Sequence, residues 1–182
     1  MKKIPTIFKR DFNNNGRITQ EYAIDPELFS MATATEKIDG MNVRVTVRNH
    51  TAVRLEKRRN TSKLEKAKGI EEPWYIDASQ SSEDKWLQDS LSNTDLSQIS
   101  DGEWSGEAVG PNIQGNPLNL LTNRIVFFSL GQCPVFENVP TTYEELKVWL
   151  PQQNSKYGMG KIEGIVWHCS DGRMMKIKNK DF

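Results

Sequence analysis

The sequence predicts an α+β fold in which antiparallel sheets are flanked by short helices. Two hairpin signals indicate the sheets: Asn49-His50 can join the extended segments on either side of it, and Asp171-Gly172 can do the same near the C-terminus. Residues 83–91 and 142–150 carry apolar side chains at helical spacing and indicate the helices. Strands joined by hairpins run antiparallel, and short helices packed outside such sheets give the α+β class.

Length and composition favour one globular domain. The chain has 182 residues, 36% hydrophobic and 26% charged, which is enough to bury a core, so we expect residues 1–182 to form a single domain. The formal net charge is zero, which excludes a strong overall field for polyanions. Any nucleic-acid binding must therefore come from local patches. The chain shows no internal repeat, which excludes solenoids and arrays.

The cysteines and the apolar runs indicate the cellular setting. Cys133 and Cys169 lack the spacing of metal ligands. The sequence shows neither a signal peptide nor an apolar run long enough to cross a membrane. We therefore expect a reduced, cytoplasmic protein that makes no use of a membrane.

A lysine lies where a predicted strand breaks into a turn. Residues 32–35 and 43–47 read as extended chain, and Asp39-Gly40 between them is a turn signal, so Lys37 is held at the mouth of a sheet. One helical turn is expected just before this strand, at residues 25–29. A lysine nucleophile must be partly deprotonated, which requires desolvation or neighbouring positive charge. The structural alternative is a solvated lysine beside a turn.

The strand that follows the lysine alternates in polarity. Its apolar face holds Val43, Val45 and Val47, and its polar face holds Asn42, Arg44, Thr46 and Arg48. Pairing through Asn49-His50 makes a β-ribbon with residues 51–57, and the far end of this ribbon delivers Lys57, Arg58 and Arg59. These cations either face phosphate or form an exposed loop.

Both predicted helices are assigned to packing. Ser81 or Ser82 can cap the helix at 83–91, which carries an apolar stripe. The capping box Thr142-x-x-Glu145 begins the helix at 142–150, which a proline then ends.

A glycine-flanked acidic segment lies between these helices. Glu103, Ser105 and Glu107 fall on alternate positions, and Gly106 and Gly110 flank Glu107, so a ligand can approach the backbone closely there. A plain strand followed by an irregular loop gives a similar pattern.

An apolar strand is expected at residues 124–130. It contains Phe127 and Phe128, each of which is either a core residue or a stacking surface.

The C-terminal hairpin allows a prediction of register. A two-residue turn at Asp171-Gly172 pairs Ser170 with Arg173, and by extension Trp167 with Lys176 and Ile165 with Lys178. Side chains alternate along a strand, so one face is expected to carry Glu163, Ile165, Trp167, Lys176 and Lys178. A carboxylate and two lysines on one face suit an anionic ligand. His168 and Cys169 read as ordinary strand residues, because neither has a partner at ligand spacing.

Five segments together resemble a known superfamily. They are Lys37-x-Asp39-Gly40, Gly106-Glu107, Phe127-Phe128, Glu163-Gly164-Ile165-Val166 and Lys176-x-Lys178. In order and spacing they resemble motifs I, III, IIIa, IV and V of the covalent nucleotidyltransferases, which comprise ATP-dependent DNA ligases, RNA ligases and mRNA capping enzymes. Asn42, five residues after the lysine, is similar to the Lys-x-Asp-Gly-x-Asn variant of the RNA ligase branch. The resemblance spans about residues 32–180 and implies a single adenylyltransferase domain, an ATP-grasp-like ligase catalytic domain.

Two departures from the superfamily pattern bear on this identification. The chain ends four residues past Lys178, so we expect no C-terminal OB-fold domain, which weighs against a DNA ligase or a capping enzyme. Ser129 follows Phe128 where RNA ligases often have Asp, which leaves open which phenylalanine stacks on the base. The alternatives are a GTP-dependent capping guanylyltransferase, a DNA ligase core, and an inactive module that only binds nucleotide or RNA.

The resemblance implies an ATP-dependent RNA ligase that joins RNA 5′-phosphate and 3′-hydroxyl ends through lysyl-AMP and RNA-adenylate. Catalytic roles are implied for Lys37, Asp39, Lys176 and Lys178. Nucleotide contacts are implied for Lys37, Arg58, Glu107, Phe128, Glu163, Lys176 and Lys178, with Arg59 as an alternative to Arg58. RNA contacts are implied for Asn42 and Arg59, and Glu163 would anchor Mg²⁺ or Mn²⁺ through water. The expected cofactors are ATP and the divalent ion, and the expected partner of this monomer is RNA.

Overall fold

The computed structural model describes residues 3–129 and 131–182, which pack into two compact units, each with a hydrophobic core of its own. Unit 1 consists mainly of Asp39–Gln132, and unit 2 consists of Ile4–Ile38 and Cys133–Phe182. A single domain over residues 1–182 stays a prediction. None of the helices in the described part of the chain has the length and apolarity needed to span a bilayer.

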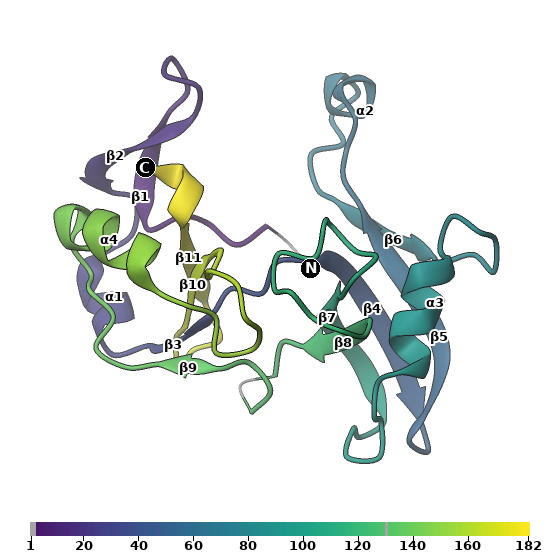
Figure 1. The fold of residues 1–182 in the computed structure, drawn as a ribbon. Helices are drawn as coiled ribbons and strands as arrows, with labels where there is room; N and C mark the ends of the chain where they lie inside the picture. The colour runs from purple at the N-terminus through teal and green to yellow at the C-terminus, as the bar shows by residue number, and fades with distance from the viewer. Residues whose placement is uncertain (1–2, 130) are drawn as a thin grey trace. The chain divides into compact units, whose positions relative to one another are not determined.

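Unit 1 is built on a five-stranded antiparallel sheet in the order β6-β5-β4-β7-β8 (Figure 1). The strands are β4 Met41–Arg48, β5 Thr51–Arg59, β6 Trp74–Asp77, β7 Gly102–Val109 and β8 Arg124–Phe127. The predicted ribbon is confirmed: Asn49 and His50 both have positive φ, 47° and 55°, as a two-residue hairpin turn requires. Val43, Val45 and Val47 are fully buried, so the predicted apolar face forms the core of unit 1.

Helix α3, Lys85–Ser92, packs on the core of unit 1 through Leu87, as predicted. The predicted serine cap is wrong, because the cap position is Asp84. Its carboxylate is held by the Ser79 backbone N–H (2.7 Å) and by the Lys57 ammonium (2.7 Å), which fixes the chain just before the helix. A second helix, α2 Lys63–Ala67, begins with a Ser62/Glu65 capping box that the sequence prediction missed.

Unit 2 is built on a four-stranded sheet in the order β11-β10-β3-β9 and a separate hairpin of two strands. The sheet strands are β3 Thr33–Glu36, β9 Val135–Phe136, β10 Gly164–His168 and β11 Met174–Lys178, and the hairpin strands are β1 Phe8–Asp11 and β2 Arg17–Tyr22. The helices are α1 Pro26–Ser30, α4 Tyr143–Trp149 and the 3₁₀ segments η1 Leu150–Gln152 and η2 Asn179–Asp181. Helices α1 and α4 begin where predicted, after Asp25 and Thr142.

The C-terminal hairpin departs from its predicted register by one residue. Cys169 donates its backbone N–H to Arg173 O at 2.9 Å, so the loop has three residues and ends with Gly172 in the left-handed region at φ 83°. The observed pairs are Gly164 with Lys178, Val166 with Lys176, and Trp167 with Met175. A shift of one residue moves every side chain to the opposite face. Trp167 and Ile165 therefore lie in the core of unit 2 with Met175 and Ile177, and the predicted face that joined them to the lysines is wrong.

The predicted strand at 124–130 is shorter than expected. Strand β8 ends at Phe127, and Leu130 lies outside the described residues. The α+β class with antiparallel sheets and short helices is confirmed.

Candidate functional site

One face of the unit 1 sheet is polar and carries the expected nucleotide-contacting side chains of that unit. Asn42 pairs directly with Glu107 across β4 and β7, and Arg58 pairs with Tyr75 across β5 and β6. Because side chains alternate, these residues point away from the valines that form the core. Asn42, Arg58 and Glu107 thus share the polar face of unit 1.

Asn42 is buried, with 5% of its surface exposed, and its amide is hydrogen bonded at both ends. Its Nδ2 donates to Gly106 O at 3.2 Å and to Glu107 Oε1 at 3.4 Å, while its Oδ1 accepts from the Tyr75 hydroxyl at 2.8 Å. Its side chain thus bonds to β6 and β7 rather than to its own turn. The RNA contact expected for Asn42 stays a prediction.

The two adjacent arginines at the end of β5 lie in different surroundings. Arg58 is half-buried on the polar face and forms no ion pair with any residue of the described ranges. Arg59 points the other way, over the Trp74 ring at 5.2 Å and toward Glu65 at 3.3 Å. Both line a cavity of about 510 Å³ in unit 1, together with Asn42. Of the two, Arg58 is the better candidate for a phosphate contact, because its charge is not already matched.

The two phenylalanines also separate. Phe127 is 1% exposed and belongs to the core of unit 1, whereas Phe128, the residue after β8, is only half-buried. Phe128 donates its backbone N–H to Ser105 O at 2.9 Å, which continues the pairing of β8 with β7. By alternation Phe128 belongs to the polar face that carries Glu107. A stacking role is therefore open to Phe128 and closed to Phe127.

Unit 2 brings three lysines to the sheet face opposite its core. Lys37 follows β3 directly and donates its backbone N–H to Gly164 O at 2.9 Å, and Gly164 pairs on its other side with Lys178. Lys176 lies two residues before Lys178 on the same face of β11 and pairs with Val166. This set, Lys37, Lys176 and Lys178, is called the lysine face below.

Glu163 is the carboxylate of the lysine face. It precedes β10, so its side chain is free of the strand alternation and reaches both ends of the row: Oε2 contacts the Lys37 ammonium, and Oε1 lies 3.9 Å from the Lys178 ammonium. Glu163 thus pairs with Lys178, one of the two β11 lysines to which the sequence prediction joined it, and forms no ion pair with Lys176, while the register that led to the prediction is wrong.

The lysine face carries more positive than negative charge. Burial, and then the neighbouring charges of Lys37 and Lys178, lowers the pKa of Lys176 to about 8. Burial also lowers the pKa of Lys178, against the opposing effect of Asp181 and Glu163. Lowered pKa values mean that the protonated lysines are destabilised by burial and by one another, and an anionic ligand would stabilise their charges.

Gly164 is required by the close pairing of β10 and β11. A Cβ at this position would collide with Ile177 O and with the Lys178 backbone. Because Gly164 has no side chain, β10 and β11 can pair this closely, which brings Lys178 level with Gly164.

Two further residues hold the lysine face in place, and the sequence prediction missed both. Glu36, directly before Lys37, is buried and accepts from Ser155 Oγ (2.5 Å) and the Lys156 backbone N–H (2.8 Å). Asp181 accepts from the Lys178 backbone N–H (3.0 Å) and pairs with Arg10 (2.7 Å). Glu36 and Ser155 are 119 positions apart and Arg10 and Asp181 are 171 positions apart, so no local pattern signals those two contacts, whereas the bond from Lys178 to Asp181 spans three residues and belongs to a capping box at η2.

The remaining expected site residue is Asp39, the first residue of the main segment of unit 1. It is half-buried, and its catalytic role stays a prediction. Within the described ranges no group of three or more His, Cys, Asp or Glu side chains could hold a metal ion. The carboxylate of Glu163 fits an ion that takes one protein ligand and completes its shell with water and phosphate oxygen, which is how Mg²⁺ usually binds.

Comparisons with known proteins agree with the resemblance seen in the sequence. A family model described as RNA ligase 1 matches residues 78–182. RNA ligase 1 of Pongo abelii is 39% identical over 74 residues, which cover 39% of this chain and 22% of that protein. RNA ligase 1 of Rattus norvegicus is 36% identical over a match that also covers 22% of its length. The match thus spans about a fifth of these relatives.

Solved structures with the same fold extend the comparison to nearly the whole chain. An RNA ligase of Naegleria gruberi with PPi superposes with a TM-score of 0.56 at 15% identity, covering 97% of this chain and 56% of that one. A variant of the Naegleria ligase with ATP and Mn gives a TM-score of 0.50 at 16% identity, covering 100% of this chain and 65% of that one. At this level of identity the similarity shows the fold, which is that of an RNA ligase.

Proposed function

Because the chain belongs to the RNA ligase 1 family, we propose that it is an ATP-dependent RNA ligase. The observation that carries the proposal is the lysine face: Lys37 lies beside two further lysines and one carboxylate. The Naegleria ligase has been solved with PPi and, as a variant, with ATP and Mn, and these are the leaving group, the nucleotide and a divalent ion that such a reaction uses.

In the first step, the neutral amine of Lys37 attacks the α-phosphorus of ATP. The new P–N bond forms as the bond to pyrophosphate breaks, and the amine loses its proton to solvent or to the adjacent carboxylate of Glu163. Lys176 and Lys178 would neutralise the α-phosphate oxygens. In-line displacement at phosphorus depends mainly on positioning and charge neutralisation, and this group of side chains can supply both.

In the second and third steps, AMP passes to the RNA and is then released. An oxygen of the RNA 5′-phosphate attacks the lysyl-AMP phosphorus, and the P–N bond to Lys37 breaks. A 3′-hydroxyl next attacks the RNA 5′-phosphorus, AMP leaves, and the strand is sealed. We assign RNA contacts in these steps to Asn42 and Arg59, from the resemblance alone. The cytoplasmic location and monomeric state expected from the sequence are part of the same proposal.

Unit 1 would bind the nucleoside. Glu107 would accept hydrogen bonds from the ribose hydroxyls, Phe128 would stack on the base, and Arg58 would contact phosphate. The half-burial of Phe128 and the unmatched charge of Arg58 support these roles. Glu163 would hold a divalent ion through water, and that ion would supply further charge neutralisation at the phosphates.

Labelled nucleotides test the proposal. The protein is incubated with divalent ion and either α-labelled ATP or α-labelled GTP, and is then denatured. We expect label from ATP to stay on the protein, and unlabelled 5′-phosphorylated RNA to remove it. Label from GTP alone would instead indicate a capping guanylyltransferase, and no label from either nucleotide would indicate a binding module. A panel of RNA and DNA strands with 5′-phosphate and 3′-hydroxyl ends then defines the substrate.

A further inference from the structure

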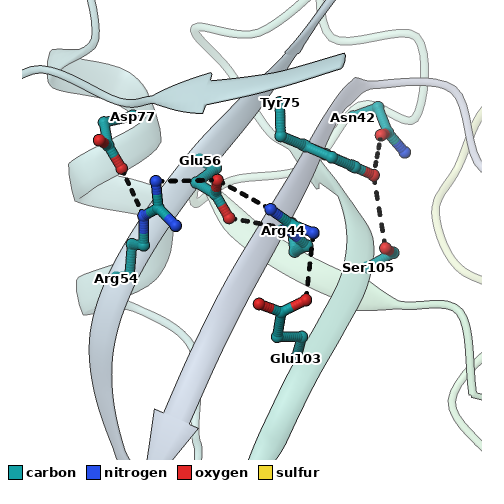
Figure 2. A network of polar contacts seen from close by, with 8 residues as sticks. All are labelled: Asn42, Arg44, Arg54, Glu56, Tyr75, Asp77, Glu103 and Ser105. Atoms are coloured by element: carbon teal, nitrogen blue, oxygen red, sulfur yellow. Dashed lines mark hydrogen bonds and ion pairs between the residues drawn. The ribbon is translucent and has the colours of Figure 1, made fainter. Parts of the chain in front are cut away.

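The Tyr75 hydroxyl lies at the centre of the polar face of unit 1, where the sequence prediction placed nothing. Figure 2 shows it between the side chains of Asn42 and Ser105. It donates to Asn42 Oδ1 at 2.8 Å and lies 3.4 Å from Ser105 Oγ. We propose that Tyr75 is a positioning residue that fixes the amide of Asn42 and, through it, the carboxylate of Glu107. The inference rests on the proposed function, in which Glu107 binds the ribose.

The bond from Tyr75 selects one orientation of the Asn42 amide. With Oδ1 turned to the Tyr75 hydroxyl, Nδ2 faces Gly106 O and Glu107 Oε1, which are both acceptors. The opposite orientation would set the Asn42 oxygen against those acceptors and leave a buried amide badly paired, which is costly. The two ends of the amide therefore reinforce each other.

Tyr75 is itself held in place by an ion-pair network. The Arg44 guanidinium lies 4.6 Å from the centre of the Tyr75 ring, a distance typical of a cation–π contact. Arg44 is locked in turn by two hydrogen bonds to buried Glu56, at 2.7 and 2.9 Å, and by one to Glu103 at 3.1 Å (Figure 2). A chain of contacts thus leads from Glu56 through Arg44 and Tyr75 to Asn42 and Glu107.

This arrangement makes Tyr75 a determinant of nucleotide selection. A carboxylate that binds a ribose hydroxyl discriminates against a nucleotide without it only if the carboxylate cannot swing to another partner. The amide of Asn42 limits that motion, and Tyr75 fixes the amide. Loss of the Tyr75 hydroxyl should therefore weaken the preference for ATP over 2′-deoxy-ATP rather than slow both equally.

The test compares kcat/KM of protein adenylylation with ATP and with 2′-deoxy-ATP. In Tyr75→Phe we expect the ATP preference to fall about three- to tenfold, the size of one neutral hydrogen bond. The matched control is Tyr22→Phe, which removes a hydroxyl that donates to Thr141 O at 3.1 Å in unit 2 and should leave the preference unchanged. In an Asn42→Ala background, Tyr75→Phe should change the preference by less than about twofold, because the two act in series.

An unchanged preference in Tyr75→Phe, or an equal fall with and without Asn42, would overturn the inference. A second readout keeps it separate from the proposed function. Water exchange of the Asn42 side-chain amide protons, measured by NMR, should be at least several-fold faster in Tyr75→Phe, and an unchanged rate would also overturn the inference. If the parent protein forms no adduct with ATP or GTP, the proposed function fails, and amide exchange alone decides whether Tyr75 fixes Asn42.

Discussion

The polar face of unit 1 and the lysine face of unit 2 differ in how far their cations are paired with carboxylates. On the first, Arg44 and Arg54 are matched within the unit by Glu56, Glu103 and Asp77, and Arg58 is the exception among the described residues. On the second, Lys37 and Lys178 pair with the same carboxylate, Glu163, and Lys176 forms no ion pair with any described residue, while Asp181 pairs with Arg10. The pKa of Arg44 is raised, first by its hydrogen bonds to Glu56, whereas burial and like charges lower that of Lys176. A matched network stabilises the fold, and an unmatched cluster is arranged for a ligand.

The largest expected effect tests whether the lysine face contains the nucleophile of the reaction. Lys37→Ala should lower adduct formation from ATP by about 10⁴-fold or more, because it removes the nucleophile itself. Far-ultraviolet circular dichroism should be unchanged, because the Lys37 side chain lies just after β3 and is not part of the hydrophobic core. Lys9→Ala, which breaks an exposed pair with Glu21, is the control and should retain activity. An adduct formed as fast as in the parent would show that another residue is the nucleophile.

The next effect tests whether the matched network is structural. Glu56→Gln removes a carboxylate that is 1% exposed, accepts two hydrogen bonds from Arg44 and forms an ion pair with Arg54, so we expect the free energy of unfolding to fall by about 2–3 kcal/mol. Asp77→Asn, which breaks the exposed end of the same network, should cost much less, because solvent screens an exposed ion pair. Urea denaturation measures both. Equal losses in the two variants would mean that burial of Glu56 contributes nothing.

Removal of a cation from the lysine face should raise the free energy of unfolding, whereas loss of Glu56 lowers it. Lys176→Met should raise the free energy of unfolding at pH 7 by about 1–2 kcal/mol, because the folded protein bears the cost of a partly buried charge, while adduct formation falls.

The gain in Lys176→Met should depend on pH in a defined direction. The Lys176 pKa is about 8 folded, against 10.5 as the ordinary value. Below pH 8 both states are protonated and the cost is full; between pH 8 and 10.5 the folded state loses its proton first, so the stability of the parent rises relative to the variant. Denaturation of both proteins at pH 7 and pH 10 measures this. A gain that grows with pH would contradict the assignment.

The smallest expected effect locates anion binding. Millimolar pyrophosphate should slow amide hydrogen exchange around Glu163–Lys178 about two- to fivefold and have a smaller effect on β5, which contributes Arg58 as its one cation without an ion pair among the described residues, whereas the lysine face contributes three lysines. A Lys176→Met, Lys178→Met double variant should lose the protection. Equal protection in β5 would mean that Arg58 binds the anion as strongly as the lysine face does.

Local patterns predicted the parts of the molecule that local rules govern. The β4–β5 ribbon follows from strict alternation and a turn whose residues tolerate positive φ, and α1 follows from its Asp25 cap. Helix α4 begins after Thr142 as predicted, but the capping box is not formed, because the Thr142 hydroxyl donates to the Glu145 carboxylate and caps no backbone N–H. The hairpin at Asp171-Gly172 was placed correctly but misregistered, because the same dipeptide ends a three-residue loop as readily as it forms a two-residue turn. The alternation of Met175 and Ile177 contained the missing information, since the predicted register would have turned Lys176 and Lys178 toward the core.

The rest of the site could not be read from the sequence because it depends on tertiary contacts. Tyr75 reaches Asn42 across β5, and Arg10 reaches Asp181 from the other end of the chain. The choice between Phe127 and Phe128 likewise required the strand register, which decides the core side of β8. The motif residues, in contrast, were found because their order along the chain is itself a pattern.

Strand β10, which carries Gly164, fixes the distance between the Lys37 and Lys178 backbones on the lysine face. Lys37 continues β3 and Lys178 lies on β11, with one strand, β10, hydrogen bonded between them. Neighbouring strands lie about 4.8 Å apart, so the two lysine backbones are held roughly 10 Å apart across a row in which the middle position has no side chain. The sheet, and not the flexible lysine stems, thus fixes the spacing of the two lysine backbones, and an anion that binds both ammonium groups must displace the Glu163 carboxylate, which contacts Lys37 and lies 3.9 Å from Lys178.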